Sequence, residues 1–128
     1  MQMSPNFESL KRSGFDPVAL FKRLDGDLEL LRDLVHIFSE ESPLLLKKIG
    51  SAIEHGALED VRRLSHKLKG SALQFSGGRV ASLAASLEDM AGRGSLSGAA
   101  SVFSDLKREV ANLEQWLQSM ATGEGWTT

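Results

Sequence analysis

The sequence predicts an all-α protein, an antiparallel up-and-down four-helix bundle with a short additional helix at its N-terminal end. First, apolar residues recur at steps of three and four along most of the 128 residues, as expected for helices with one buried face. Second, alternation of apolar and polar residues never holds for long, so no strand is expected. Third, the chain has only three prolines, and short glycine-containing breaks separate the periodic stretches.

The first elements lie before residue 56. Residues 1–13 are polar and irregular, and we expect a flexible arm ahead of a single bundle domain at residues 14–121. Asp16 is a suitable N-cap for a short helix that has Pro17 at its first position and runs through residue 24. Asp27 follows a break and is a suitable cap for the next helix.

The second helix is predicted to be long, with a kink at Pro43 where its apolar pattern continues without a gap. His55 and Gly56 should close it, with glycine at the C-terminal cap. Its predicted apolar face consists of Leu31, Leu34, Val35, Phe38, Leu44, Leu45, Ile49 and Ile53.

Three more helices complete the predicted bundle. The third runs from about residue 58 to Phe75, and a turn at residues 76–78 leads into the fourth. A second break at residues 92–95 precedes the fifth helix, for which Ser95 or Ser97 is the expected N-cap. Residues 122–128 are expected to form a flexible tail.

The composition limits the classes of function. With 15 basic and 17 acidic residues the net charge is −2, which argues against a general polyanion-binding protein. The absence of cysteine excludes disulfides, thiolate metal ligands and cysteine nucleophiles. The N-terminus lacks the apolar run that would predict a signal peptide. The sequence also lacks a stretch of about 18 apolar residues that would predict a membrane span. We therefore expect a cytoplasmic protein without membrane contact.

The third helix carries an unusual group of exposed residues. Its apolar face consists of Val61, Leu64, Leu68, Ala72 and Phe75. At about 100° per residue, His66 lies roughly 160° from the centre of that face, so its imidazole should be exposed to solvent. Lys69 is its neighbour one turn later, and Gly70 and Leu73 follow on the exposed side. A helical glycine costs about 1 kcal/mol relative to alanine, which indicates that something must approach closely at Gly70.

The other two histidines have ordinary explanations. His36 lies opposite the apolar face of its helix and is expected at the surface, whereas His55 lies at a helix end, where the dipole favours a positive charge. No phosphate-cradling loop, paired zinc-ligand motif or nucleophile elbow is present. The sequence therefore predicts neither a metal site nor a nucleotide site.

The residues from His66 to Ala72 resemble the phosphorylation motif of histidine-containing phosphotransfer (HPt) domains, which consists of His, any residue, an aliphatic residue, Lys, Gly and then small residues. The likeness continues in residues 24–31, which resemble the family's turn into its long helix, and in the small-residue helix after the motif. It covers roughly residues 15–120.

This resemblance implies a carrier that relays a phosphoryl group between aspartates of response-regulator receiver domains. His66 would be the phospho-acceptor, Lys69 would neutralise phosphate charge, and Gly70 would leave room for the receiver. The protein would act as a monomer, without kinase activity or a cofactor of its own, because the receiver would supply Mg²⁺. Its partners would be receiver domains and a sensor or hybrid kinase. The expected docking residues are Arg62, Arg63, Lys67 and Leu73.

Glu88 is the candidate for orienting the imidazole. It lies on the flank of the fourth helix, about ten residues after the turn, and His66 lies about ten residues before it. In an antiparallel hairpin the two residues are at a similar height, and the resemblance implies a Gln or Glu bonded to the imidazole. A carboxylate that accepts from Nδ1–H would leave Nε2 free to attack.

Three alternatives stay open on the sequence alone. A non-catalytic adaptor that docks receiver domains would not need His66, Lys69 and Gly70 together. A nucleic-acid-binding bundle is disfavoured by the acidic charge balance and by the scarcity of aromatic residues on the basic face. The dimerising domain of a sensor kinase would be a two-helix hairpin followed by an ATP-binding part, whereas this sequence predicts a full bundle.

Overall fold

The computed structural model describes residues 17–75 and 77–122, so the predicted N-terminal arm, the Asp16 cap, Ser76 of the turn and residues 123–128 of the predicted tail lie outside the described residues. Within the described part the chain is all-α, as predicted. The helices are α2 (Pro17–Arg23), α3 (Leu28–Glu54), α4 (Leu58–Leu73), α5 (Gly78–Gly92) and α6 (Ala99–Ala121).

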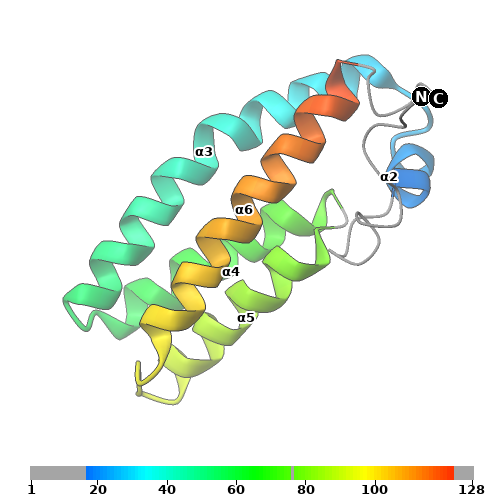
Figure 1. Ribbon diagram of the computed structural model, residues 1–128. Coiled ribbons are helices and arrows are strands. Elements are labelled where there is room, and N and C mark those ends of the chain that lie inside the picture. Colours follow the sequence, from blue (N-terminus) through cyan, green and yellow to red (C-terminus); the bar gives the residue numbers. More distant parts are fainter. Residues whose placement is uncertain (1–16, 76, 123–128) are drawn as a thin grey trace.

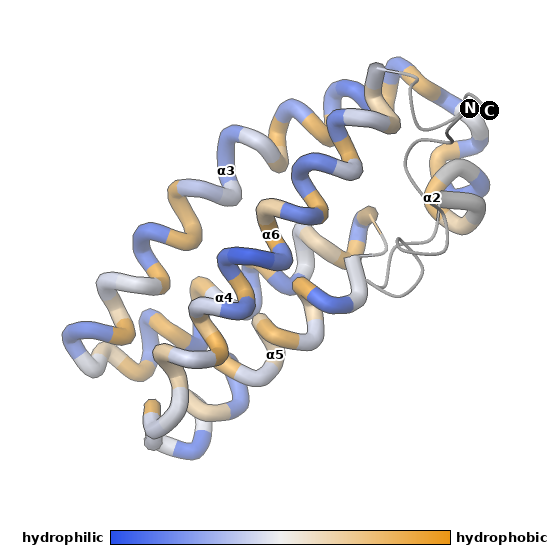
Figure 2. Tube along the Cα trace, viewed as in Figure 1, coloured by the Kyte–Doolittle hydropathy of each residue, from blue (hydrophilic) through white to orange (hydrophobic). Residues whose placement is uncertain are grey.

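Helices α3 to α6 form an antiparallel four-helix bundle (Figure 1). Each helix packs against two others, in the cyclic order α3, α4, α5, α6. Apolar segments recur along each helix at the helical period (Figure 2), and the buried ones form one continuous core. Within it, the rings of Phe38 and Phe75 meet edge to face with centroids 5.5 Å apart.

The end of the bundle that carries α2 also holds the C-terminal end of α4 (Figure 1). Leu20 of α2 is fully buried. Arg23 donates hydrogen bonds to the carbonyl oxygens of Leu73 and Gln74, at 2.6 and 2.7 Å. The last carbonyls of a helix have no partner within the helix, so Arg23 caps α4 at this end.

Both predicted ends of α3 are confirmed. The Asp27 side chain accepts a hydrogen bond of 2.9 Å from the Leu30 N–H, and Gly56 has the left-handed φ of 65° that suits a glycine cap. Pro43 lies inside α3 without ending it. The prediction that Leu44 belongs to the buried face is wrong, because its exposure is 61%. Its neighbour Leu45 is buried, and adjacent helical residues point about 100° apart.

A tight connection makes α4 and α5 an antiparallel pair. Helix α4 ends at Leu73, two residues earlier than predicted, although Phe75 is buried beyond it. The Gly77 N–H donates to the Ala72 carbonyl at 2.9 Å. A Cβ at Gly77 would lie 2.8 Å from Leu113 Cδ2 of α6 and 3.1 Å from the Ala72 carbonyl oxygen, so a side chain at this position would force its surroundings to shift.

The predicted cap of α6 is wrong. Neither Ser95 nor Ser97 occupies the position; the N-cap is Gly98, and it makes no side-chain cap hydrogen bond. Gly98 has a left-handed φ of 83°, a conformation that serine rarely adopts. The Ser95 hydroxyl instead accepts a hydrogen bond from the Ser97 N–H within the loop. At the other end, Thr122 is the C-cap of α6.

Candidate functional site

His66 stands on the outer face of α4, as its distance from the apolar face predicts. Its side chain is 65% exposed, whereas the neighbouring Ser65 is fully buried on the core side. The ring is held on one side only, through Nδ1. Within the part of the chain that the structure describes, no residue forms a hydrogen bond with Nε2. One ring nitrogen is therefore fixed and the other faces solvent.

Glu88 of α5 joins His66 to Lys69. Its Oε2 lies 2.9 Å from His66 Nδ1 and its Oε1 lies 2.9 Å from Lys69 Nζ. Lys69 and Glu88 are partly buried, with side-chain exposures of 28% and 21%. The structure thus brings together His66 and Glu88, which the hairpin register places at a similar height, and Lys69, which lies one turn after His66.

The charge on Glu88 decides which nitrogen of His66 carries the proton. The ammonium of Lys69, followed by the hydrogen bond from His66, lowers the pKa of Glu88, although partial burial opposes this. Glu88 is therefore ionised at neutral pH, and an ionised carboxylate only accepts hydrogen bonds. This assigns the proton of a neutral His66 ring to Nδ1 and leaves the lone pair on Nε2.

Gly70 leaves the space beside His66 open. A Cβ built there would meet no atom within 4 Å, so alanine would fit and the absence of a side chain is not required by packing. Leu73, one turn further along α4, is 51% exposed. A shallow depression lies beside Gly70, and its lining includes Leu73, Leu34 of α3, Arg23 and Leu24.

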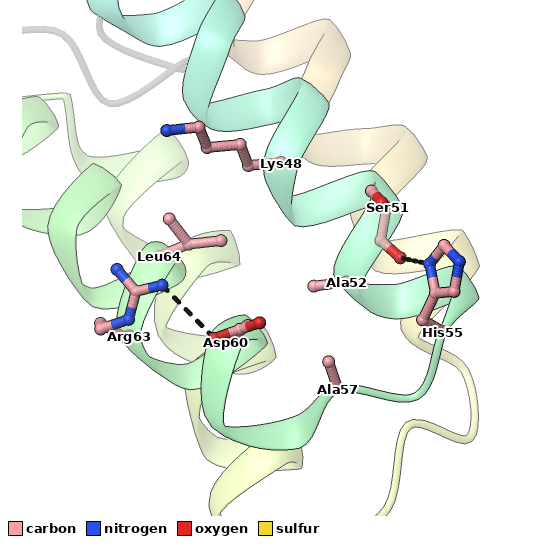
Figure 3. Close-up of a pocket in the computed structure, with 8 residues that line it drawn as sticks. All are labelled: Lys48, Ser51, Ala52, His55, Ala57, Asp60, Arg63 and Leu64. Atoms are coloured by element: carbon pink, nitrogen blue, oxygen red, sulfur yellow. Dashed lines mark hydrogen bonds and ion pairs between the residues drawn. The ribbon is translucent and has the colours of Figure 1, made fainter.

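Two of the three predicted basic docking residues form ion pairs with acids of their own helix. Arg62 pairs with Glu59 through two hydrogen bonds, one of them Nε to Oε1 at 3.1 Å. Arg63 pairs with Asp60 at 3.3 Å and lines a separate depression between α3 and α4 (Figure 3). Both acids lie three residues before their arginine, so this pairing was visible in the sequence. Lys67 is exposed.

Two exposed apolar residues were missed in the sequence. Leu30 and Ile37 of α3 are half exposed or nearly so, and with Leu44 they recur every seven residues along one side of the helix. That spacing returns nearly to the same face, so it could have been recognised. By the same 100° arithmetic, Leu34 lies between this row and the buried face, and it borders the depression beside Gly70.

The remaining histidines lie where they were predicted. His36 is exposed and lies 3.4 Å from Glu40 on the same helix. His55 is the C-cap of α3, and its Nδ1 is 2.8 Å from the Ser51 carbonyl oxygen (Figure 3). Over the described ranges, no group of three or more His, Cys, Asp or Glu residues is arranged to hold a metal ion. Among the same residues, no helix is long and apolar enough to cross a membrane.

Comparison with known proteins agrees with this geometry. Residues 33–116 match the sequence profile of the Hpt domain. The crystal structure of histidine-containing phosphotransfer protein B (HptB) from Pseudomonas aeruginosa PAO1 is similar, with a TM-score of 0.79 and 21% sequence identity. The match covers 85% of this chain and 95% of that one, and at this identity it shows the shared fold. A search of curated proteins gave no match.

Proposed function

This chain belongs to the Hpt domain family, and we propose that it carries a phosphoryl group between receiver-domain aspartates on Nε2 of His66. Members of this family are phosphocarriers in phosphorelays rather than kinases. The proposal specifies the acceptor atom and the residues around it. It rests most on one observation: Nδ1 of His66 is held by an ionised glutamate while Nε2 faces solvent.

The site suits phosphoryl transfer because that reaction needs positioning more than it needs bond-making groups. Its transition state is loose, with charge spread over the phosphoryl oxygens. Glu88 would fix the ring so that the Nε2 lone pair points outward, and Lys69 would lie beside the incoming negative charge. Gly70 would allow the backbone of a partner to come close to the phosphoryl group. The partner receiver would supply Mg²⁺ and the acidic residues that bind it.

The exposed apolar residues suggest how a receiver would dock. Leu73 lies two turns after His66 on α4, and Leu30 and Ile37 are exposed on the neighbouring α3. The depression beside Gly70 lies between these two helices. We propose that a receiver covers this apolar surface with its active site above His66, while the basic residues Arg62 and Lys67 lie at the rim.

The protein should not phosphorylate itself from ATP. The sequence has no phosphate-cradling loop. Label from ATP should therefore appear on the protein only when both a kinase and a receiver domain are added. Labelling of the purified protein by ATP alone would contradict the assignment as a carrier.

Transfer from a phosphorylated receiver domain tests the proposal directly. Radiolabelled candidate receivers should pass their phosphoryl group to the wild-type protein and should not pass it to His66→Gln. A His36→Gln variant is the matched control, because His36 is also exposed but lacks the lysine and glycine neighbours. Transfer to His66→Gln would disprove the proposal, and binding of receivers without any transfer would favour the adaptor.

A further inference from the structure

The exposed apolar row on α3 is bordered by carboxylates. At about 100° per residue, Asp33 and Glu41 lie about 40° to either side of Ile37, the centre of the row. Glu40 lies about 60° from the same centre, and all three acids are exposed. Glu40 lies 3.4 Å from His36, whereas Asp33 and Glu41 form no ion pair with any residue that the structure describes. We call Asp33, Glu40 and Glu41 the acidic end of the surface.

The same surface has a basic end. Lys48 lies within about 20° of the line of the row, and it lines a depression between α3 and α4 together with Arg63 and Asp60. In Figure 3 the side chains of Lys48 and Arg63 lie on the same side of this depression. Asp60 pairs with Arg63, but Lys48 and Lys67 are exposed and have no ion pair in the described part of the chain. Lys48, Arg63 and Lys67 form the basic end.

His66 lies between the two ends. Lys48 shares its depression with Arg63, one turn before His66 on α4. Leu34 shares the other depression with Gly70, one turn after His66. Since α3 and α4 are antiparallel neighbours (Figure 1), the acidic end lies on the Gly70 side of the histidine and the basic end on the Arg63 side.

We propose that this charge polarity along the α3–α4 surface selects receivers that carry basic residues on the flank covering Asp33, Glu40 and Glu41, and that it fixes the orientation in which they dock. The inference rests on the proposed function and names the kind of receiver that the site takes. It also reverses the simple expectation from the sequence, in which only basic residues of this chain meet the partner.

A receiver fits this polarity in one orientation. Its own active site is acidic, because carboxylates bind its Mg²⁺, and the basic end therefore attracts that part of the receiver. Turned around, the receiver would set its acids against Asp33 and Glu41, and like charges across an interface disfavour binding. Charge at the edge of an interface acts mainly on the rate of association and on the choice of partner.

The one cation described beside the acidic end does not cancel it. Arg23 lines the depression beside Gly70, and its guanidinium donates hydrogen bonds to the carbonyl oxygens of Leu73 and Gln74. The three carboxylates of the acidic end thus outnumber this single positive charge. A partner that brings further basic side chains would complete the balance.

A second copy of this chain is a poor occupant of the surface. In an antiparallel pair of α3 helices centred on Ile37, Asp33 of one copy would face Glu41 of the other, and Glu40 would face Leu34. In a parallel pair each acid would face its own equivalent. Both arrangements place acid against acid or against an apolar residue, so the row is better covered by a partner with basic flanks.

Charge inversion tests the proposal in the transfer assay, with the candidate receiver that transfers fastest to the wild type as the probe. Asp33→Lys/Glu41→Lys should slow transfer by about tenfold at low salt and by less than about twofold at ~0.5 M salt, where exposed charges are screened. Glu54→Lys/Asp105→Lys is the matched control, because it also changes the net charge from −2 to +2 (−2 + 4 = +2) but lies outside the row and the two depressions. The control should transfer at nearly the wild-type rate, and circular dichroism should show both variants folded.

The receiver side gives the second arm of the test. Replacing single Lys or Arg residues on the docking face of the same receiver by Glu should, for at least one of them, slow transfer to the wild type and restore it to Asp33→Lys/Glu41→Lys. Equal low-salt rates in the inverted variant and its control would overturn the inference and leave the phosphocarrier function standing. A wild-type dimer in sedimentation that dissociates in the inverted variant would also overturn it, by assigning the surface to self-association. Absence of transfer from every receiver to the wild type would overturn the proposed function and this inference with it.

Discussion

Two glutamates, Glu88 and Glu114, each connect a pair of helices in this bundle, yet only one of them leaves a reactive atom exposed. Glu114 of α6 accepts hydrogen bonds from the Ser39 hydroxyl of α3 and from Gln118 Nε2, the latter at 3.2 Å. Gln118 Nε2 also donates to Ser39 Oγ at 2.9 Å, which closes the triangle. Around Glu88 the chain of contacts is open, because His66 offers one nitrogen to the carboxylate and turns the other to solvent.

The comparison separates a structural polar contact from a functional one. The partners of Glu114 are neutral, and the bonds among the three residues end within the cluster. Glu88 has a cation on one oxygen and a titratable ring on the other, which fixes its charge. An interhelical glutamate is therefore informative about function only when one of its partners keeps a reactive atom that is exposed to solvent.

The largest expected effect on phosphoryl transfer comes from placing a bulky side chain at position 70, beside the solvent-facing side of His66. Gly70→Gln should leave the circular dichroism spectrum intact, because a Cβ at this position meets no neighbour. Transfer from a phosphorylated receiver should nevertheless slow by about 100-fold, the cost of a small misplacement at a reacting centre. Gly70→Ala is the control, and it should keep transfer close to wild type. Equal rates in the wild type and Gly70→Gln would remove the steric role of Gly70.

Removing the carboxylate from the open site should have a smaller effect on rate. Glu88→Ala should slow transfer by about tenfold without abolishing it, since a hydrogen bond to a charged group is worth about 1.5 kcal/mol. Glu114→Ala is the matched variant and should transfer at the wild-type rate. If both substitutions changed the rate equally, the distinction between the two glutamates would be lost. Transfer kinetics measured with one receiver preparation would decide this.

For stability the order of the two variants should be reversed, with Glu114→Ala more destabilising than Glu88→Ala. Glu114→Ala removes the shared acceptor of a half-buried cluster, so it should lower the free energy of unfolding by about 1 kcal/mol. Urea denaturation monitored by circular dichroism measures this change. An unchanged midpoint would show that the α3–α6 cluster contributes nothing to the fold.

The smallest expected effect is on the pH dependence of stability. Lys69, and then His66, lower the pKa of Glu88 in the folded protein. The stabilisation is therefore fully present above the unfolded-state pKa and is lost as pH falls through the folded one. Between about pH 5 and 3, the wild type should lose more stability than Glu88→Gln. Parallel stability curves for the two proteins in this range would show that the ion pair adds nothing measurable.

The sequence was sufficient for those features that depend on helical period and register. His66 was placed by its distance from the apolar face, and the height of Glu88 followed from the length of the hairpin. The cap of α6 was not predictable in the same way, because the backbone conformation at Gly98 outweighs the capping preference of Ser95 and Ser97.

Long side chains were the hardest to place. The sequence did not predict that Lys69 lies against Glu88, because a flexible side chain on a flank takes the nearest opposite charge. The expected role of Lys69 toward incoming phosphate stays a prediction. The pairing of Arg62 with Glu59, in contrast, follows from a spacing of three residues and was overlooked. The role of Glu88 in transfer is still a prediction, since the structure gives only its position.

The most direct test of the account is to locate the phosphoryl group on the phosphorylated protein. After transfer from a receiver, mass spectrometry should show a single phosphoryl group on the peptide that contains His66. NMR of the ring should place it on Nε2, with Nδ1 still protonated, and the modification should be labile in acid and stable in base. A phosphoryl group on Nδ1 of His66, or on His36 or His55, would contradict the account.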